Sequence, residues 1–473
     1  MKYLSSLYVL ISVGVLGVSA SAQPNIIYIN ADDLGVMDVG FNNSAYRTPN
    51  LDRLQAEGML FTAAYAPAAN CAPSRACVFS GQYTPRHGIY TVGSAARGHA
   101  SYRKLIPIKN RVYLNREVLT LSEVLREGGY KTIHLGKWHL GEDPTLQGFD
   151  INVGGYEFGS PKGGYFIPVK GEVATYNDRY PPGTHIADIF ADQAVTFIKA
   201  NKADRFFMHM AYYLIHTPIQ AVPGLVEKYG DAKDRRAAYA SMIEKMDESI
   251  GKILEELDAQ GLRERTLVLF SSDNGAHSAL SSQKPYRSGK GSYFEGGIRE
   301  PLVVRWPGKV KTGSRCDVPV MGIDFFPTFL EAADIPVPEG KVLDGVSLMP
   351  LLTESGHFPE RALFWHFPIY LQAYAGKADD SHDPLFRTRP GSALRKGKWK
   401  FHEYFEEGDL ELYDLNHDPG ERHNVARLYP EKTAELHAEI KQWRETLQAP
   451  VPSEPNPEYQ AEVAKKALLE ARE

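Results

Sequence analysis

The chain has 473 residues, which is long enough to bury a large hydrophobic core and longer than one average domain. Hydrophobic residues make up 43% and charged residues 23%, and this ordinary globular composition excludes an intrinsically disordered chain. The formal net charge of −5 gives no reason to expect a nucleic acid or an anionic membrane as a partner. An anionic substrate would have to be attracted by a local cluster of cations.

The N-terminus has the pattern of an export signal. Lys2 supplies the positive start, residues 7–18 are apolar, and Ala-Ser-Ala at 20–22 is a small-residue cleavage site. A membrane anchor is the alternative, but the apolar run is short for a span. We therefore predict a signal peptide at 1–22, and export to the periplasm or to the outside of the cell.

Four short apolar runs, each followed by polar or charged residues, are typical of buried strands. They are 26–29, 132–135, 206–212 and 267–270. Helical patterns lie between them, such as the capping box of Thr120 with Glu123 and the apolar face that begins at Met242. Strands that alternate with helices predict a mostly parallel α/β sheet covered on both faces. In such sheets ligands bind beyond the carboxyl ends of the strands, where all four runs carry their polar residues.

The sequence Cys-Ala-Pro-Ser-Arg at 71–75 predicts a helix start with unusual chemistry. Pro73 suits the first turn of a helix and Gly81 suits its end. Cys71 would then lie at a helix N-terminus, where free amide groups favour a bound anion, and Arg75 would add donors one turn later. A helix-start cysteine without a chemical role is the alternative.

Two polar pairs follow the first and fourth apolar runs. Asp32 and Asp33 form one pair, and Asp273 and Asn274 form the other. For either pair alone a loop turn or helix cap would be the better explanation. Together, beside an anion-binding helix, three carboxylates and an amide oxygen suit Ca²⁺ better than Zn²⁺, with Mg²⁺ as the alternative.

Further charged and imidazole groups follow the other runs. Lys137 and His139 stand in Gly-Lys-Trp-His-Leu-Gly, His216 stands in His-Thr-Pro, and Lys290 stands in Gly-Lys-Gly. A lone histidine is more often structural than catalytic. Here each histidine follows a predicted strand, and glycine neighbours let the backbone approach closely, so we count all four groups as candidate site residues.

The C-terminal part changes character after about residue 350. Runs at 363–367, 392–400 and 410–415 predict a smaller antiparallel sheet, and 430–447 predicts a helix that packs on it. We expect a catalytic domain at 23–350, an α+β subdomain at 351–449 and an extended tail with a terminal helix at 450–473.

Three long segments are rich in glycine, tyrosine, arginine and histidine. They are 91–116, 153–185 and 371–391. Segments of this length in a compact fold are often the walls or lids of a functional site. The cysteines Cys71, Cys77 and Cys316 are too few for a disulfide framework. Cys77 and Cys316 could pair, but we expect two buried thiols.

These motifs, in this order, resemble the formylglycine-dependent (type I) sulfatases of the alkaline-phosphatase superfamily, and look most like exported carbohydrate sulfatases. The resemblance runs from about residue 24 to 350 and continues more weakly into the C-terminal part. One departure is Phe79, which stands where leucine is usual and should still fill an apolar slot. The resemblance implies a large mostly parallel sheet flanked by helices, followed by a smaller antiparallel sheet with a helix.

The resemblance also implies the site. Cys71 would be the precursor of formylglycine (3-oxoalanine), made by a formylglycine-generating or radical maturation enzyme. Asp32, Asp33, Asp273 and Asn274 would bind Ca²⁺ together with residue 71. The implied sulfate pocket is lined by Arg75, Lys137, His139, His216 and Lys290.

The implied reaction follows from a hydrated aldehyde, which has two hydroxyl groups. One hydroxyl attacks sulfur after losing its proton near Asp273, and His216, helped by Lys290, protonates the departing alcohol. The second hydroxyl then loses its proton to His139, sulfate leaves and the aldehyde is regenerated.

A sugar alcohol is a poor leaving group, so an acid such as His216 fits carbohydrate sulfates. The resemblance favours galactose- or N-acetylgalactosamine-type sulfates of glycosaminoglycans or carrageenans, and hence polysaccharide degradation. Four further residues are candidate substrate contacts, although each taken singly is more often structural: His277, Arg287, His366 and His402.

Three alternatives stay open at this point. The first is a phosphonate or phosphate monoester or diester hydrolase of the same superfamily; such relatives usually carry histidine where Asn274 stands here, which favours calcium and sulfate. The second is an arylsulfatase of broad specificity. The third is a non-catalytic protein that binds sulfated glycans, against which the complete set of expected catalytic residues counts.

Overall fold

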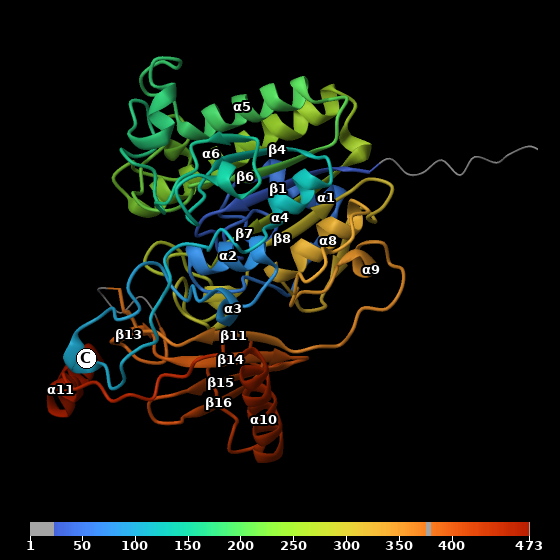
Figure 1. The fold of residues 1–473 in the computed structure, drawn as a ribbon. Coiled ribbons are helices and arrows are strands. Elements are labelled where there is room, and N and C mark those ends of the chain that lie inside the picture. Colours follow the sequence, from blue (N-terminus) through green and yellow to red (C-terminus); the bar gives the residue numbers. More distant parts are fainter. Residues whose placement is uncertain (1–22, 375–379, 473) are drawn as a thin grey trace, which may run out of the picture.

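The computed structural model describes residues 23–374 and 380–472 (Figure 1). A large α/β part is followed by a smaller antiparallel sheet with a long helix, which confirms the predicted fold class. The predicted signal peptide at 1–22 lies outside the described residues. Within the described part, no helix is both long and apolar enough to cross a membrane.

The main sheet has eight strands, and its five consecutive strands from β5 to β7 are parallel. Strand β8 runs antiparallel to both of its neighbours, β7 and β2. The strands, in sheet order, are β5 (Ile151–Val153), β4 (Lys131–Gly136), β6 (Phe206–Ala211), β1 (Asn25–Ala31), β7 (Thr266–Ser272), β8 (Leu302–Arg305), β2 (Met59–Phe61) and β9 (Ser314–Cys316).

The four predicted strands are confirmed as β1, β4, β6 and β7, and they lie side by side in the order β4, β6, β1, β7. Because these four strands are parallel, the polar residues that follow them come out at one edge of the sheet. The apolar runs are continuous because each strand is buried on both faces.

Helices cover both faces of this sheet. In β1, Ile27 and Ile29 pack on one side, against α1 (Pro49–Glu57), α5 (Ile186–Ala200) and α6 (Arg235–Ala259). Ile26 and Tyr28 pack on the other side, against α2 (Cys71–Ser80), α4 (Leu121–Glu127) and α8 (Phe325–Ala332). The alternation follows from the two-residue period of a strand. The predicted apolar face of α6 is buried in the first cluster.

Helix α2 begins at Cys71 and ends before Gly81, which adopts the left-handed conformation with φ of 67°, as predicted. Phe79 in this helix is buried, with its ring edge-to-face against Trp138 at 4.9 Å, so it fills an apolar slot. The capping box of Thr120 and Glu123 at the start of α4 is also confirmed.

The remaining elements of the large part are short. The strands are β3 (Ala64–Tyr65) and β10 (Val320–Met321), and the helices are α3 (Thr84–His87), α7 (Glu295–Ile298) and α9 (Met349–Leu352). The 3₁₀ turns are η1 (Ala100–Tyr102), η2 (Pro144–Gln147), η3 (Gly171–Tyr176), η4 (Val226–Lys228), η5 (Arg263–Arg265) and η6 (Gly322–Asp324). Segment 91–116 contains η1 alone, and segment 153–185 contains η3 and the last residue of β5. Segment 371–391 contains β12 (Leu371–Gln372), β13 (Phe386–Thr388) and the first residue of the next strand.

The C-terminal sheet is antiparallel, as predicted. Its strands are β11 (Leu363–Phe367), β14 (Gly391–Lys396), β15 (Trp399–Tyr404) and β16 (Leu410–Asp414), and it is followed by α10 (Pro430–Leu447) and α11 (Ala461–Arg472). The prediction of a single strand at 392–400 was wrong. Gly397, with φ of 56°, turns the chain there into the hairpin of β14 and β15.

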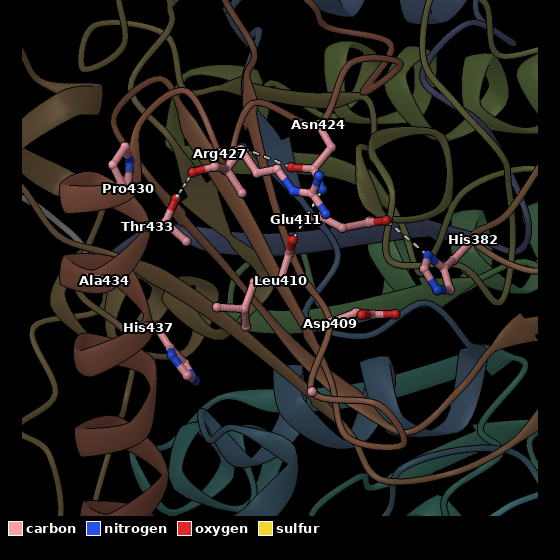
Figure 2. Close-up of a pocket in the computed structure, with 12 residues that line it drawn as sticks. His382, Asp409, Leu410, Glu411, Asn424, Arg427, Pro430, Thr433, Ala434 and His437 are labelled. Carbon is pink, nitrogen blue, oxygen red and sulfur yellow. Dashed lines mark hydrogen bonds and ion pairs between the residues drawn. The ribbon is translucent and has the colours of Figure 1, made fainter.

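A cavity of about 680 Å³ lies between β16 and α10 (Figure 2). His382 and Glu411 form an ion pair of 3.0 Å at its wall, and Arg427 and His437 also line it. None of the site residues predicted from the sequence lines this cavity.

The cysteines other than Cys71 differ in burial. Cys77 is a buried free thiol, as expected, with Sγ 3.3 Å from Nε2 of His87. Cys316 is also a free thiol, but it is only half-buried because it lies in the edge strand β9. The expectation of two buried thiols therefore holds for Cys77 alone.

The close contact of β4 and β6 depends on Gly136, the last residue of β4. Its φ is 91°, and a Cβ atom there would lie 2.0 Å from the main-chain oxygen of Ala211. The same oxygen accepts the N–H of Lys137 at 2.7 Å. Gly136 therefore places the backbone of Lys137 at the sheet edge.

We expect Gly136→Ala to lower the free energy of unfolding by about 2–4 kcal/mol, because left-handed strain and a clash with rigid backbone add together. Gly397→Ala is the matched control, since Gly397 also has positive φ but nothing lies within 4 Å of an added Cβ. It should lose only about 1 kcal/mol. Urea unfolding curves measure both losses, and equal losses would contradict the argument.

Candidate active site

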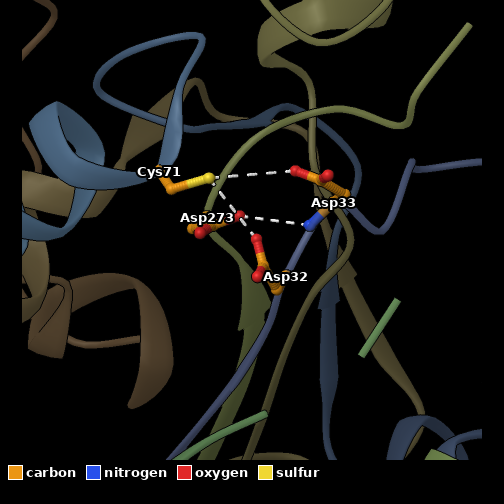
Figure 3. A group of neighbouring side chains, drawn as sticks. All are labelled: Asp32, Asp33, Cys71 and Asp273. Carbon is orange, nitrogen blue, oxygen red and sulfur yellow. Dashed lines mark hydrogen bonds between the residues drawn. The ribbon is translucent and has the colours of Figure 1, made fainter. Parts of the chain in front are cut away.

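Four buried side chains converge at the carboxyl edge of the main sheet (Figure 3). They are Asp32, Asp33, Cys71 and Asp273, and their ligand atoms all lie within 4.8 Å of one another. Asp32 and Asp33 follow β1, Asp273 follows β7, and Cys71 is the first residue of α2. The structure thus brings together the predicted metal ligands and the predicted nucleophile.

The strand register explains why these carboxylates meet. Strands β1 and β7 are parallel neighbours that end in register at Ala31 and Ser272, so the next residue of each is an aspartate. The N–H of Asp33 donates to Oδ1 of Asp273 at 3.2 Å, which ties the two turns together. Asp33 has a φ of 64°, a strained conformation for a residue other than glycine.

Three cations face the three carboxylates. Lys137 Nζ lies 2.6 Å from Oδ2 of Asp32, Lys290 Nζ lies 2.6 Å from Oδ1 of Asp33, and Arg75 Nη2 lies 2.8 Å from Oδ2 of Asp273. All three pairs are buried or nearly so. In so little water each charge interacts strongly, and loss of one partner would leave the other uncompensated.

The charge compensation is uneven across the cluster. Burial raises the pKa of Asp32 to about 8 although Lys137 opposes this shift, and Asp273 and Asp33 raise it further. Burial also acts to raise the pKa of Asp33, but Lys290 and His216 outweigh it and hold that pKa below its usual value. Burial therefore outweighs the attraction of Lys137 at Asp32, whereas the attraction of the nearby cations outweighs burial at Asp33.

The donor set fits a hard divalent cation. Asn274 donates Nδ2 to Oδ1 of Asp33 at 2.8 Å, while its Oδ1 atom is buried and has no hydrogen-bond partner among the described residues. Such an orphaned oxygen beside three carboxylates is what a Ca²⁺ site requires, since Ca²⁺ takes about six to eight oxygen ligands. Asp32, Asp33, Asp273, Asn274 and residue 71 are the groups that would hold the ion.

Cys71 is poorly suited to act as a nucleophile in its thiol form. Its Sγ atom lies 3.5 Å from Oδ1 of Asp32 and 3.3 Å from Nζ of Lys290. Burial raises the pKa of Cys71 to about 12, although Lys137 and Lys290 act in the opposite direction. The side chain is therefore a protonated thiol near neutral pH, whereas reactive cysteines are thiolates.

His216 follows β6 and reaches toward the cluster. Its Nδ1–H donates to the carbonyl of Thr217 at 2.8 Å, which leaves Nε2 facing Oδ2 of Asp33 at 3.9 Å. Burial and the nearby Lys290 lower the pKa of His216 to about 3, against the influence of Asp33. The imidazole is thus neutral near pH 7.

His139 lies on the turn after β4 with a φ of 63°, and its N–H donates to the carbonyl of Tyr156 at 2.9 Å. Its Nδ1 atom is buried without a hydrogen-bond partner among the described residues. Burial, together with Lys137 and Arg75, lowers the pKa of His139 well below its usual value. A neutral imidazole of this kind can accept a proton.

The four predicted substrate contacts are placed differently. His277 is half-buried near the cluster and stacks on Tyr374 with ring centroids 3.9 Å apart. Arg287 donates to the carbonyls of Glu421 and Ser381, both at 3.0 Å. Their roles in substrate binding stay predictions.

The other two predicted contacts are buried in the C-terminal sheet. His366 contacts Ser392 Oγ at 2.8 Å and the carbonyl of Pro450 at 2.9 Å, and His402 Nε2 lies 3.2 Å from Glu421 Oε1. Both side chains thus have partners within the protein interior, and their roles in substrate binding also stay predictions.

The sequence analysis did not single out three residues that lie near the cluster: Arg97, Tyr374 and Arg387. Arg387 donates to the carbonyl of Lys290 at 3.2 Å, and its guanidinium lies over the ring of Tyr374 at 3.5 Å. All three lie in the segments 91–116 and 371–391, whose length and composition were the available signal.

Comparisons with known proteins show which proteins this chain resembles. A family model described as Sulfatase matches residues 24–335, and one described as N-sulphoglucosamine sulphohydrolase, C-terminal, matches residues 289–449. The chain is 31% identical to a protein named Sulfatase from Formosa agariphila over 490 residues, covering 87% of this chain and 86% of the relative. It is 33% identical to N-acetylgalactosamine-6-sulfatase of Rattus norvegicus over 389 residues, covering 76% and 71%. Among solved structures, Ps i-CgsB in complex with k-i-k-neocarrahexaose has a TM-score of 0.72 at 28% identity, covering 89% of this chain and 92% of that one.

We expect Ca²⁺ to stabilise the folded protein, because the site exists only when the turns after β1 and β7 meet. At a free concentration of 100 times the Kd the gain is about 2.7 kcal/mol. Asp273→Asn should abolish the calcium-dependent gain measured by thermal unfolding with Ca²⁺ and with chelator. The control is Asp247→Asn, a buried carboxylate outside the cluster that accepts the N–H of Leu51 at 2.8 Å, and it should keep the gain. A gain retained by Asp273→Asn would refute the assignment.

Proposed function

Because the chain belongs to the sulfatase family and is therefore a hydrolase of sulfate esters, we propose that its substrate is a sulfated carbohydrate. The sugar is of the galactose or N-acetylgalactosamine type, within a glycosaminoglycan or a carrageenan. This proposal is supported by the name of the rat relative and by the hexasaccharide named with the solved structure. The observation that carries the chemistry is the buried cluster of three carboxylates, three cations and residue 71 at one sheet edge.

The family uses formylglycine and Ca²⁺, and we infer that Cys71 is the residue converted here. The raised pKa of the buried Cys71 thiol supports this, since the unconverted side chain offers no thiolate. A separate maturation enzyme, of the formylglycine-generating or radical type, would supply the oxidant. We further propose that residues 1–22 direct export to the periplasm or the outside.

The hydrated aldehyde of residue 71 has two hydroxyl groups, and each has a separate task. The first attacks sulfur and gives its proton to Asp273, while the bond between sulfur and the sugar oxygen breaks. The second then gives its proton to His139, the bond between residue 71 and sulfate breaks, and the aldehyde returns. Ca²⁺, when bound, supplies Lewis-acid polarisation of oxygen atoms at this site. Arg75, Lys137 and Lys290 offset negative charge on the moving sulfate oxygens.

His216 is the proton donor to the departing sugar oxygen. Its Nδ1–H is fixed by the Thr217 carbonyl, so the transferred proton must sit on Nε2. Burial and Lys290 lower the pKa of His216 to about 3. An anionic sulfate ester beside the ring raises this pKa, so protonation of His216 accompanies substrate binding.

Sulfate release from sulfated oligosaccharides tests the proposed function. We expect aldehyde-bearing protein to release inorganic sulfate, and Cys71→Ala to release none, as measured by ion chromatography. Mass spectrometry of residue 71 in the same samples checks its chemical state. Sulfate release by protein with an intact Cys71 thiol would overturn the mechanism, and failure of aldehyde-bearing protein on every sulfated sugar would overturn the substrate class.

We expect His216→Ala to slow hydrolysis of a sugar sulfate by about 10²- to 10⁴-fold, because the alkoxide leaving group needs a proton. Nitrophenyl sulfate should be affected far less, since nitrophenolate leaves without protonation. His423→Ala is the control, because the His423 side chain is 83% exposed. Equal losses of kcat on both substrates would show that His216 is not the proton donor.

A further inference from the structure

Two arginines beside the catalytic cluster have no acidic partner among the described residues. Neither Arg97 nor Arg387 forms an ion pair with any of the described carboxylates, although Arg387 is only 8% exposed. Arg75 a short way off is, by contrast, paired with Asp273 at 2.8 Å. A buried cation without a counter-ion carries a desolvation cost, which a bound anion would offset.

Arg387 is held directly behind a catalytic residue. Its Nε and Nη1 donate to the carbonyls of Gln372 at 3.0 Å and Lys290 at 3.2 Å. The side chain of the same Lys290 lies 3.3 Å from Cys71 Sγ. The Arg387 guanidinium also lies 3.5 Å from the centre of the Tyr374 ring, and that ring stacks on His277. The cation is thus fixed in direction by main chain and by an aromatic face.

Arg97 comes from a different segment to the same region. Its N–H donates to the carbonyl of Tyr370 at 3.3 Å, and its Nη2 donates to Thr91 Oγ1 at 3.0 Å. Its Nε atom is buried without a hydrogen-bond partner among the described residues. Burial and the neighbouring Arg387 lower the pKa of Arg97 to about 10, with Tyr374 and Cys71 opposing. Arg97 therefore stays charged near neutral pH, within electrostatic range of both Arg387 and Cys71.

We propose that Arg97 and Arg387 bind a second oxyanion of the substrate, a sulfate or carboxylate group close to the sulfate ester that is cleaved. This inference rests on the proposed function and narrows the substrate to sugars or sugar pairs with two anionic groups. A planar guanidinium presents a fork of donors that matches the oxygens of sulfate and carboxylate. One anion between the two arginines would offset their mutual repulsion.

Binding to the unconverted Cys71 protein in the presence of Ca²⁺ tests this without turnover. The probes for calorimetry are galactose 6-sulfate against galactose 4,6-disulfate, and N-acetylgalactosamine 6-sulfate with and without a linked glucuronic acid. We expect the doubly anionic member of at least one pair to bind about 10- to 100-fold more tightly, as for hydrogen bonds to charged groups. The pair that shows the preference identifies the second group as sulfate or carboxylate.

Substitution of each arginine separates binding from a structural role. Arg97→Gln and Arg387→Met should each bring the affinity ratio of the preferred pair toward one, and Arg387→Lys should restore part of it. Arg116→Gln is the matched control, because Arg116 lies in the same segment and is 63% exposed, and it should keep the wild-type ratio. Thermal unfolding of each variant checks that it is folded.

Two outcomes would overturn the proposal. One is a wild-type ratio near one for both probe pairs, and the other is a ratio that both arginine substitutions leave unchanged. Sulfate release by aldehyde-bearing wild type is measured in parallel. Its absence would contradict the proposed function, while the affinity ratios would still report on the arginines.

Discussion

The ion pairs that hold three carboxylates together in a buried site are the constraint on which this structure depends. Oδ2 of Asp32 and Nζ of Lys137 lie 2.6 Å apart, and both side chains are fully shielded from solvent. Burial of such charges is tolerable only if every partner is in place. The two residues are 105 positions apart and follow β1 and β4, which are separated in the sheet by β6. The sheet must therefore be complete before the site can form.

The same constraint explains where the backbone is strained. Asp33 and His139 both have left-handed φ values, of 64° and 63°, and both lie on turns directly after parallel strands. Side chains other than glycine avoid this conformation unless surrounding contacts impose it. Here the N–H of Asp33 is bonded to Asp273, and that of His139 to Tyr156. The edge of a rigid parallel sheet supplies the fixed points that such turns need.

The central strands and the limits of helix α2 could be predicted from the sequence, because they follow from local patterns. Apolar runs with polar ends predicted the central strands, and Pro73 with Gly81 predicted the limits of helix α2. What local patterns cannot give is which strands become neighbours. The register of β1 with β7, which brings Asp32 to Asp273, is a property of the whole sheet.

The features that the sequence did not predict also depend on contacts between residues far apart in the chain. The hairpin at Gly397 was predicted as one strand, and the pairing of β14 with β15 shows the turn. Arg97 and Arg387 were not singled out because they lie in the long segments 91–116 and 371–391 and do not follow a predicted strand. Their proximity arises from packing of residue 97 beside Tyr370, which no spacing along the chain reveals. The candidate catalytic groups Asp32, Lys137 and Asp273 therefore follow strand ends, whereas the proposed second anion site lies in the long segments 91–116 and 371–391. The hydrogen bond from Arg387 to the carbonyl of Lys290 connects the proposed anion site to the catalytic cluster. An anion bound by Arg387 would therefore also affect the position of Lys290.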